Sequence, residues 1–78
     1  MKEVDIYRAT GLTLRKLRVE AGFSQEKLAL EAGISRSMID RCERAERLPS
    51  IEILFKIGNA LNIPASEILQ MIENEIEP

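Results

Sequence analysis

The sequence contains no histidine and only one cysteine, Cys42. A single cysteine cannot form an intrachain disulfide. Without histidine there is also no Ser-His or Cys-His catalytic pair and no metal site of the Cys/His kind. No Gly-rich phosphate loop is present either. These absences predict that the chain is not an enzyme and that it holds no metal or cofactor.

Long apolar runs are also missing. Charged residues interrupt every apolar stretch well before the ~18 residues that a membrane span needs. The first residues, MKEVDIYRATG, lack the apolar segment of a signal peptide. With the lone cysteine, this favours the reducing cytoplasm. We expect no membrane partner, and no motif indicates a small-molecule ligand.

The net charge of −2 conceals an uneven distribution. Residues 8–47 carry nine basic and six acidic side chains, a net charge of +3. Residues 48–78 carry one basic and five acidic side chains, a net charge of −4. Such asymmetry is typical of a protein with one face toward phosphates, although ordinary solvated charge would also produce it.

Hydrophobic spacing predicts an all-α chain, because no stretch alternates in the manner of a strand. The predicted helices cover about 6–21, 25–32, 35–44, 51–61 and 65–75. Ser24, Ser35 and Ser50 are placed to cap the helices that follow them, and Pro64 fits the first turn of the last helix. We expect residues 1–78 to form a single domain. The expected apolar centre is the fourth helix, through Ile51, Leu54, Phe55, Ile57, Gly58 and Leu61.

The segment from Ser24 to Arg44 reads as a helix, a turn at Gly33 and a second helix. On the second helix Met38, Ile39 and Cys42 share one side. The opposite side carries polar residues: Arg36, Ser37, Asp40, Arg41 and Arg44. A solvated amphipathic helix has this pattern, and so does a recognition helix whose arginines bind guanine edges in the DNA major groove.

Several short motifs at fixed spacing narrow this choice. They are TGLTLRKLR at 10–18, GFSQEKLA at 22–29, AGIS at 32–35, IDRCER at 39–44, PSI at 49–51, ALNI at 60–63 and IL at 68–69. Over about 10–69, with residues 70–78 as a C-terminal extension, the chain resembles the phage repressor and Cro family of helix-turn-helix domains, the xenobiotic-response-element-like regulators. The resemblance implies a compact five-helix, lambda-repressor-like fold and a transcriptional regulator. Stand-alone members of this size include restriction–modification controller proteins.

The resemblance also implies residue roles. Gln25 matches a glutamine that anchors a DNA phosphate. For Asp40 the chemistry of the residue itself leaves three roles open: it accepts from a cytosine amino group, it repels phosphate and so sharpens specificity, or it restrains Arg36 or Arg44. The expected DNA-contacting set is Ser24, Gln25, Ser35, Arg36, Ser37, Asp40, Arg41, Arg44 and Arg47. Arg18 and Glu43 match a structural ion pair. Many members have glycine where this chain has Ala45, so the end of the recognition helix is expected to differ.

A family member of this kind binds a pseudo-palindrome as a two-fold homodimer, with half-sites ~34–36 Å apart. The last helix offers an apolar ridge as the expected dimer interface, formed by Ile68, Met71, Ile72 and Ile76. The alternative, that these residues close the core, fits Ile68 and Leu69 well and Ile76 poorly. Double-stranded DNA of the nucleoid and a second copy are thus the expected partners, with RNA polymerase as a further candidate. The alternative is a protein-interaction or antitoxin module on the same fold, which the acidic C-terminal half would suit.

Overall fold

The computed structural model describes residues 2–76 and consists of five helices. They are α1 (Glu3–Glu20), α2 (Gln25–Ala32), α3 (Arg36–Glu43), α4 (Ile51–Leu61) and α5 (Ala65–Ile76). The prediction of five helices is confirmed, and residues 2–76 contain no strand. The largest difference is at α1, which begins three residues earlier than expected. There the Asp5 carboxylate accepts from the backbone N–H of Lys2 and so caps the first turn.

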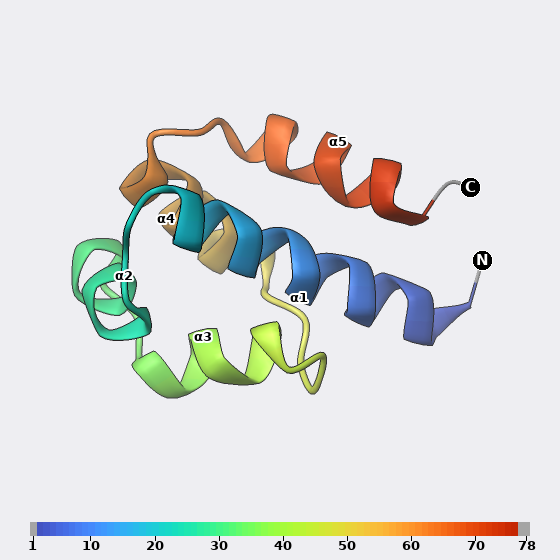
Figure 1. Ribbon diagram of the computed structural model, residues 1–78, viewed down its shortest axis with the longest axis horizontal. Helices are drawn as coiled ribbons and strands as arrows, with labels where there is room; N and C mark the ends of the chain where they lie inside the picture. Colours follow the sequence, from blue (N-terminus) through green and yellow to red (C-terminus); the bar gives the residue numbers. More distant parts are fainter. Residues whose placement is uncertain (1, 77–78) are drawn as a thin grey trace.

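The helices surround one core, with α1 in the centre (Figure 1). Helix α1 packs against α3 and α5, α2 packs against α3 and α4, and α4 packs against α5. The start of α1 and the end of α5 lie at the same end of the molecule (Figure 1). None of the helices in the described part of the chain is long and apolar enough to cross a membrane.

The core takes residues from all five helices. Its buried apolar members are Ala9, Leu14, Leu17, Leu28, Ala29, Ala32, Ile39, Cys42, Leu54, Ile57, Leu61, Ile68 and Ile72. Cys42 is completely buried in this core, and burial raises the pKa of its thiol. It therefore remains a neutral, inaccessible thiol at physiological pH.

Two residues expected in the apolar centre of α4 lie on the surface instead. Ile51 is 75% exposed and Phe55 is 63% exposed, whereas Leu54 and Ile57 are buried. The reason is the direction of the helix face: Ile51 and Phe55 lie one turn apart on its flank, beside the inward stripe. Apolar spacing alone does not show which edge of such a stripe a neighbouring helix covers.

The prediction that a ridge on α5 is exposed as a dimer interface is wrong for two of its four residues. Ile68 and Ile72 are buried in the core, and Met71 and Ile76 are half-buried against it. The four-residue spacing therefore marks the side of α5 that closes over α1 and α4. The exposed apolar residue of this helix is Leu69, at 50% exposure.

Gly11 allows α1 to approach α3 closely. A Cβ at this position would lie 2.6 Å from the carbonyl oxygen of Cys42 and 2.8 Å from that of Glu43. Such distances are too short for a methyl group, so any side chain would force the two helices apart. This close approach explains a glycine in the middle of α1.

The predicted serine caps are confirmed. The hydroxyl oxygens of Ser24, Ser35 and Ser50 accept from the backbone N–H groups of Lys27, Met38 and Ile53, respectively, at 3.0–3.1 Å. Pro64 lies one position before α5, not within its first turn. Its carbonyl oxygen accepts from Glu67 and Ile68 and so begins the helix.

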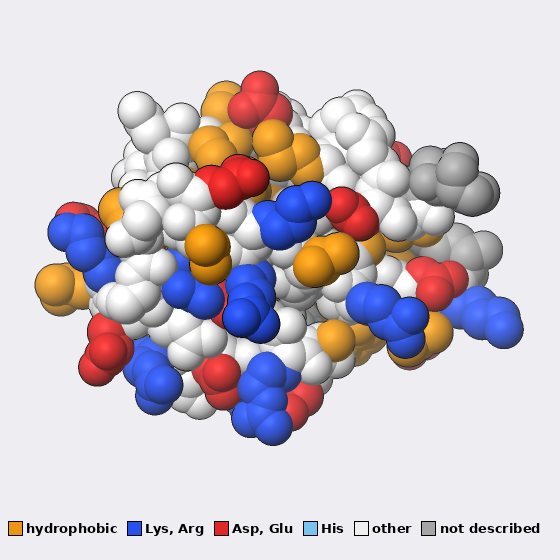
Figure 2. All heavy atoms as spheres, in the orientation of Figure 1, with side chains coloured by type: hydrophobic (Ala, Val, Ile, Leu, Met, Phe, Trp, Pro, Cys, Tyr) orange, Lys and Arg blue, Asp and Glu red, His pale blue; other side chains and the backbone are white. Residues whose placement is uncertain are grey.

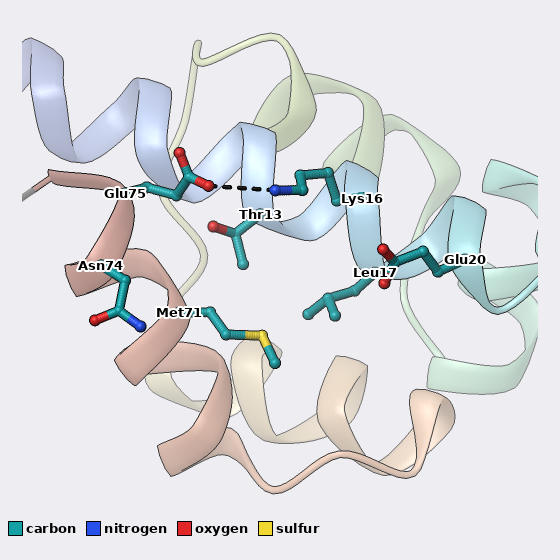
Figure 3. A pocket seen from close by; sticks show the side chains of 7 residues that line it. All are labelled: Thr13, Lys16, Leu17, Glu20, Met71, Asn74 and Glu75. Carbon is teal, nitrogen blue, oxygen red and sulfur yellow. Dashed lines mark hydrogen bonds and ion pairs between the residues drawn. The ribbon is translucent and has the colours of Figure 1, made fainter.

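A hollow of about 270 Å³ lies between α1 and α5 (Figure 3). Lys16 on α1 reaches across to Glu75 on α5, with 3.3 Å between Nζ and Oε1. Beside this ion pair, the Oγ1 atom of Thr13 is buried and has no hydrogen-bond partner within the described residues. The seam between α1 and α5 thus contains one exposed ion pair and one unsatisfied hydroxyl group.

Candidate nucleic-acid interface

Helices α2 and α3 are joined by a short turn that ends α2 sharply. Gly33 adopts a left-handed conformation, with φ of 70°, and its N–H and that of Ile34 bond to carbonyls of the last turn of α2. A side chain would be strained at this φ, so glycine fits the position. Ser35 then caps α3. The turn fixes the direction in which α3 leaves α2.

Helix α3 buries one side and exposes the other. Ile39 and Cys42 are buried, and Met38 is half-buried against the core. Arg36, Ser37 and Arg41 are exposed, as are Ser35 before the helix and Arg47 after it. Within residues 2–76 neither Arg36 nor Arg41 forms an ion pair. Their donors are therefore free to bind another molecule.

Asp40 and Arg44 interact one turn apart on α3. Arg44 Nη1 lies 3.5 Å from Asp40 Oδ2, and Arg44 Nη2 lies 3.3 Å from Glu46 Oε2. The Arg44 side chain is 64% exposed, so these pairs are weak and easily exchanged for a phosphate. Of the roles predicted for Asp40, the restraint of Arg44 is the one for which the structure has a contact.

Gln25, at the first turn of α2, lies against two carboxylates. Its Nε2 atom donates to Asp40 Oδ1 at 3.3 Å and to Glu43 Oε1 at 3.1 Å. Both amide protons are thus engaged within the protein. A phosphate at this helix terminus would have to draw the amide away from one carboxylate, a competition that the sequence did not indicate.

Beneath this surface, Arg18 on α1 and Glu43 on α3 form the expected structural pair. Arg18 Nε lies 2.6 Å from Glu43 Oε2, and Arg18 Nη2 lies 3.0 Å from Oε1. A third donor, Nη1, bonds to the carbonyl oxygen of Phe23. Hydrogen bonding to Glu43 raises the pKa of Arg18, so its guanidinium keeps its charge. Because Gln25 also bonds to Glu43, one carboxylate links α1, α2 and α3.

Ala45 ends α3 in a left-handed conformation, with φ of 62°. The N–H of Glu46 bonds to the carbonyl of Arg41 and that of Ala45 to the carbonyl of Cys42. This is the Schellman pattern, in which glycine is the preferred residue. The backbone therefore ends as it would with glycine, contrary to the expected difference, and the alanine is strained.

One cation of this surface escaped the sequence analysis. Lys27 is exposed in the first turn of α2, with Nζ 5.5 Å from the ring centroid of Phe23 and 3.8 Å from Glu31 Oε1. Its position three residues after the capping Ser24 was the available signal. Leu30, for which the sequence gave no account, is 82% exposed on the same helix.

The charges follow this geometry. In Figure 2, Lys and Arg side chains gather over the lower part of the molecule, where α2 and α3 lie, with Asp and Glu side chains among them. No group of three or more Cys, Asp or Glu side chains within residues 2–76 is arranged to hold a metal ion.

The family model described as "Helix-turn-helix" (HTH_3) matches residues 14–68. The chain belongs to this helix-turn-helix family. It is 35% identical, over 83% of its length, to the HTH-type transcriptional regulator SutR of Escherichia coli, but spans only 36% of that protein.

Two solved structures are similar to this helix-turn-helix chain along most of their length. The restriction–modification controller protein C.AhdI of Aeromonas hydrophila is 37% identical, with a TM-score of 0.76, over 80% of this chain and 94% of that one. The controller protein C.Esp1396I, solved as a tetramer with its natural 35 base-pair operator, is 28% identical, with a TM-score of 0.81, over 91% of this chain and 93% of that one. The resemblance to regulators that include controller proteins is confirmed.

Proposed function

We propose that this chain is a sequence-specific DNA-binding transcriptional regulator whose helix α3 enters the major groove. The observation that carries the proposal is the outer side of α3, where Arg36, Ser37 and Arg41 are exposed. Neither arginine is engaged by a carboxylate of the described chain. An arginine fork that is free in this way can bond to both O6 and N7 of a guanine.

The residues around this helix supply phosphate contacts. Arg44 and Arg47 follow the base-reading positions, and the first turn of α2 presents Ser24, Gln25 and Lys27. Phosphate contacts of this kind fix the register of a protein on the duplex, while base contacts give the specificity. In this arrangement the chain acts as one DNA-binding domain.

Relatives support this assignment. SutR is an HTH-type transcriptional regulator, and C.Esp1396I is seen on its natural operator. Because the chain matches C.AhdI over 94% of that protein, a controller-type role is the version that we favour. A regulator of this kind acts on cytoplasmic DNA, where RNA polymerase is a further partner. It would have no enzymatic activity.

A symmetric operator requires a dimer, and the interface needs a new location now that Ile68 and Ile72 are assigned to the core. We place it on the outer sides of α4 and α5, where Ile51, Phe55 and Leu69 are all at least half exposed. A hollow of about 480 Å³ separates Phe55 from the start of α5 and offers space for the partner's side chains. C.Esp1396I, which assembles as a tetramer on its operator, supports a second copy as the occupant.

The test is selection from a random double-stranded DNA library with the purified chain at near-physiological salt. We expect enrichment of a two-fold symmetric motif with guanines at the positions that α3 reaches. The matched control is the Phe55→Ser variant, which should enrich half-sites without fixed spacing. Strongly salt-dependent binding with no motif would show only general phosphate attraction, and the protein-interaction alternative would then replace this proposal.

A further inference from the structure

One long side of α1 is uncovered and has an unusual composition. Val4, Arg8, Leu12, Arg15 and Val19 recur every three or four residues and so share one side of the helix; we call them the α1 stripe. Val4 is 53% exposed, Leu12 46% and Val19 57%. Hydrophobic and basic side chains alternate across the middle of Figure 2, along the course of α1.

Neither the core nor the proposed DNA contacts explain this stripe. The core side of α1 is formed by other residues, chiefly Leu14 and Leu17. Helix α1 lies between α3 and α5, which leaves the stripe open between them (Figure 1). Three large aliphatic side chains on one exposed side of one helix indicate a binding surface more than scattered surface hydrophobes do.

The surface beside Leu12 is hollowed on both sides. One hollow, of about 480 Å³, is lined by Leu12, Arg15, Lys16, Val19 and Glu20. The other, of about 230 Å³, lies between α1 and the end of α5 and is lined by Asp5, Arg8, Ala9, Leu12, Glu75 and Ile76. Each is large enough to receive an apolar side chain from a partner, and Leu12 forms the ridge between them.

The cations of the stripe are unpaired, which indicates the charge of the partner. Within residues 2–76 neither Arg8 nor Arg15 forms an ion pair, whereas the adjacent Lys16 is paired with Glu75. An apolar row with free arginines is complementary to an apolar row flanked by carboxylates. DNA is a poor match, because the three aliphatic side chains would face phosphates. A bilayer is a poor match too, because the apolar strip is narrow.

We propose that the α1 stripe is a docking surface for an acidic amphipathic helix of a partner protein. Val4 and Val19 are separated by about 22 Å along α1, at 1.5 Å per residue. The matching partner helix has about four turns, with apolar residues in the two hollows and Asp or Glu opposite Arg8 and Arg15. Under the proposed function, such a partner would bind the regulator beside its DNA-reading helix.

The test is a peptide-display selection on the immobilised full-length chain, with a library of helical peptides and no DNA present. We expect enriched peptides that carry carboxylates on both sides of an apolar row. Amide chemical shifts of the ¹⁵N-labelled protein should change mainly along residues 4–19 when such a peptide binds. Because DNA is absent, failure here is distinguishable from failure of the DNA-binding assignment.

Variants make the assignment specific. Leu12→Ser and Arg15→Glu should each raise the dissociation constant of the enriched peptide by about tenfold or more, as expected for central residues of an interface. Leu30→Ser is the matched control, because Leu30 is also an exposed leucine but lies on α2. It should leave the affinity unchanged. Far-ultraviolet circular dichroism checks folding, and Arg15→Glu is informative by itself if Leu12→Ser unfolds.

Three results would overturn the proposal. In the first, the selection enriches no helical peptide. In the second, the enriched peptides bind equally well to the wild type and to both stripe variants. In the third, sedimentation shows that Arg15→Glu abolishes self-association of the chain, while acidic peptides still bind to this variant. The last result would assign the stripe to a second copy of this chain.

Discussion

Arg18 and Arg41 lie on neighbouring helices and have opposite surroundings. The Arg18 side chain is only 12% exposed, and its three donor nitrogens bond to Glu43 and to the carbonyl oxygen of Phe23. Arg41 is exposed and has no ion-pair partner within residues 2–76. The guanidinium of Arg18 thus stabilises the fold, whereas the guanidinium of Arg41 remains available for binding.

The two environments depend on each other. Glu43 accepts from Arg18 on α1 and from Gln25 on α2, and it is itself the last residue of α3. The buried pair therefore fixes the orientation of the helix that presents Arg36 and Arg41. Because the backbone of α3 is already ordered, its exposed arginines can bind without the loss of backbone entropy that ordering would cost.

The largest expected effect comes from removing one partner of the buried pair. Glu43→Ala leaves the Arg18 guanidinium buried and uncompensated, which costs about 3–5 kcal/mol of unfolding free energy. Chemical denaturation measures the loss. The double variant Arg18→Met/Glu43→Leu should recover most of it, because it removes both charges. A double variant as unstable as the single one would show that the pair itself, and not the unpaired charge, is decisive.

Substitution of the exposed arginines should reduce DNA binding and leave the stability of the fold nearly unchanged. Arg36→Ala and Arg41→Ala are each expected to reduce the preference for the selected DNA site by about 1–3 kcal/mol, the contribution of one good bidentate base contact. Stability should change by less than about 0.5 kcal/mol, as for other surface substitutions. Fluorescence anisotropy on specific and scrambled duplexes measures the first quantity and thermal unfolding the second. Loss of folding would remove the distinction between the two kinds of arginine.

The sequence predicted the elements better than it predicted the surface. Serine caps and Gly33 are local signals, and they correctly located the starts of α2 and α4 and the turn before α3. Ile68 and Ile72 were placed on the surface because periodicity gives the apolar side of a helix but not what covers it. For the same reason Phe55 was placed inside. Which side is covered depends on the packing of five helices together.

In the candidate site, too, the features within one helix were predictable and the contacts between helices were not. The outward side of α3 follows from helical periodicity within one element, and the exposure of Arg36, Ser37 and Arg41 agrees with it. The bonds of Gln25 to Asp40 and Glu43 join residues 15 and 18 positions apart. No local pattern specifies such a contact. The role of each residue toward DNA remains a proposal.

Thr13 adds a third case to the comparison, a polar group that is buried and unpaired. Its Oγ1 atom has no partner in the seam between α1 and α5 (Figure 3). Thr13→Val replaces the hydroxyl with a methyl group of similar size and is expected to stabilise the fold by about 1 kcal/mol, the cost of a buried unsatisfied group. Thermal unfolding measures the gain. A loss of stability would mean that the hydroxyl is satisfied in solution, for example by water.

The smallest expected effect tests whether the end of α3 is held by its backbone or by its charges. Ala45 has a φ of 62°, which glycine adopts without the steric cost that a Cβ incurs. Ala45→Gly should therefore stabilise the fold by about 0.5–1 kcal/mol, reduced by the greater freedom of glycine in the unfolded chain.

The matched control for Ala45→Gly is Arg44→Ala, which removes the pairs with Asp40 and Glu46 and leaves the backbone unchanged. It should alter stability by less than about 0.5 kcal/mol, because those pairs are exposed. If Arg44→Ala lowers the free energy of unfolding by more than Ala45→Gly raises it, the surface charges and not the Schellman turn position the segment that leads to Arg47. Arg44 would then share the structural role of Arg18, and the division between buried structural and exposed binding arginines would fail at this end of the helix.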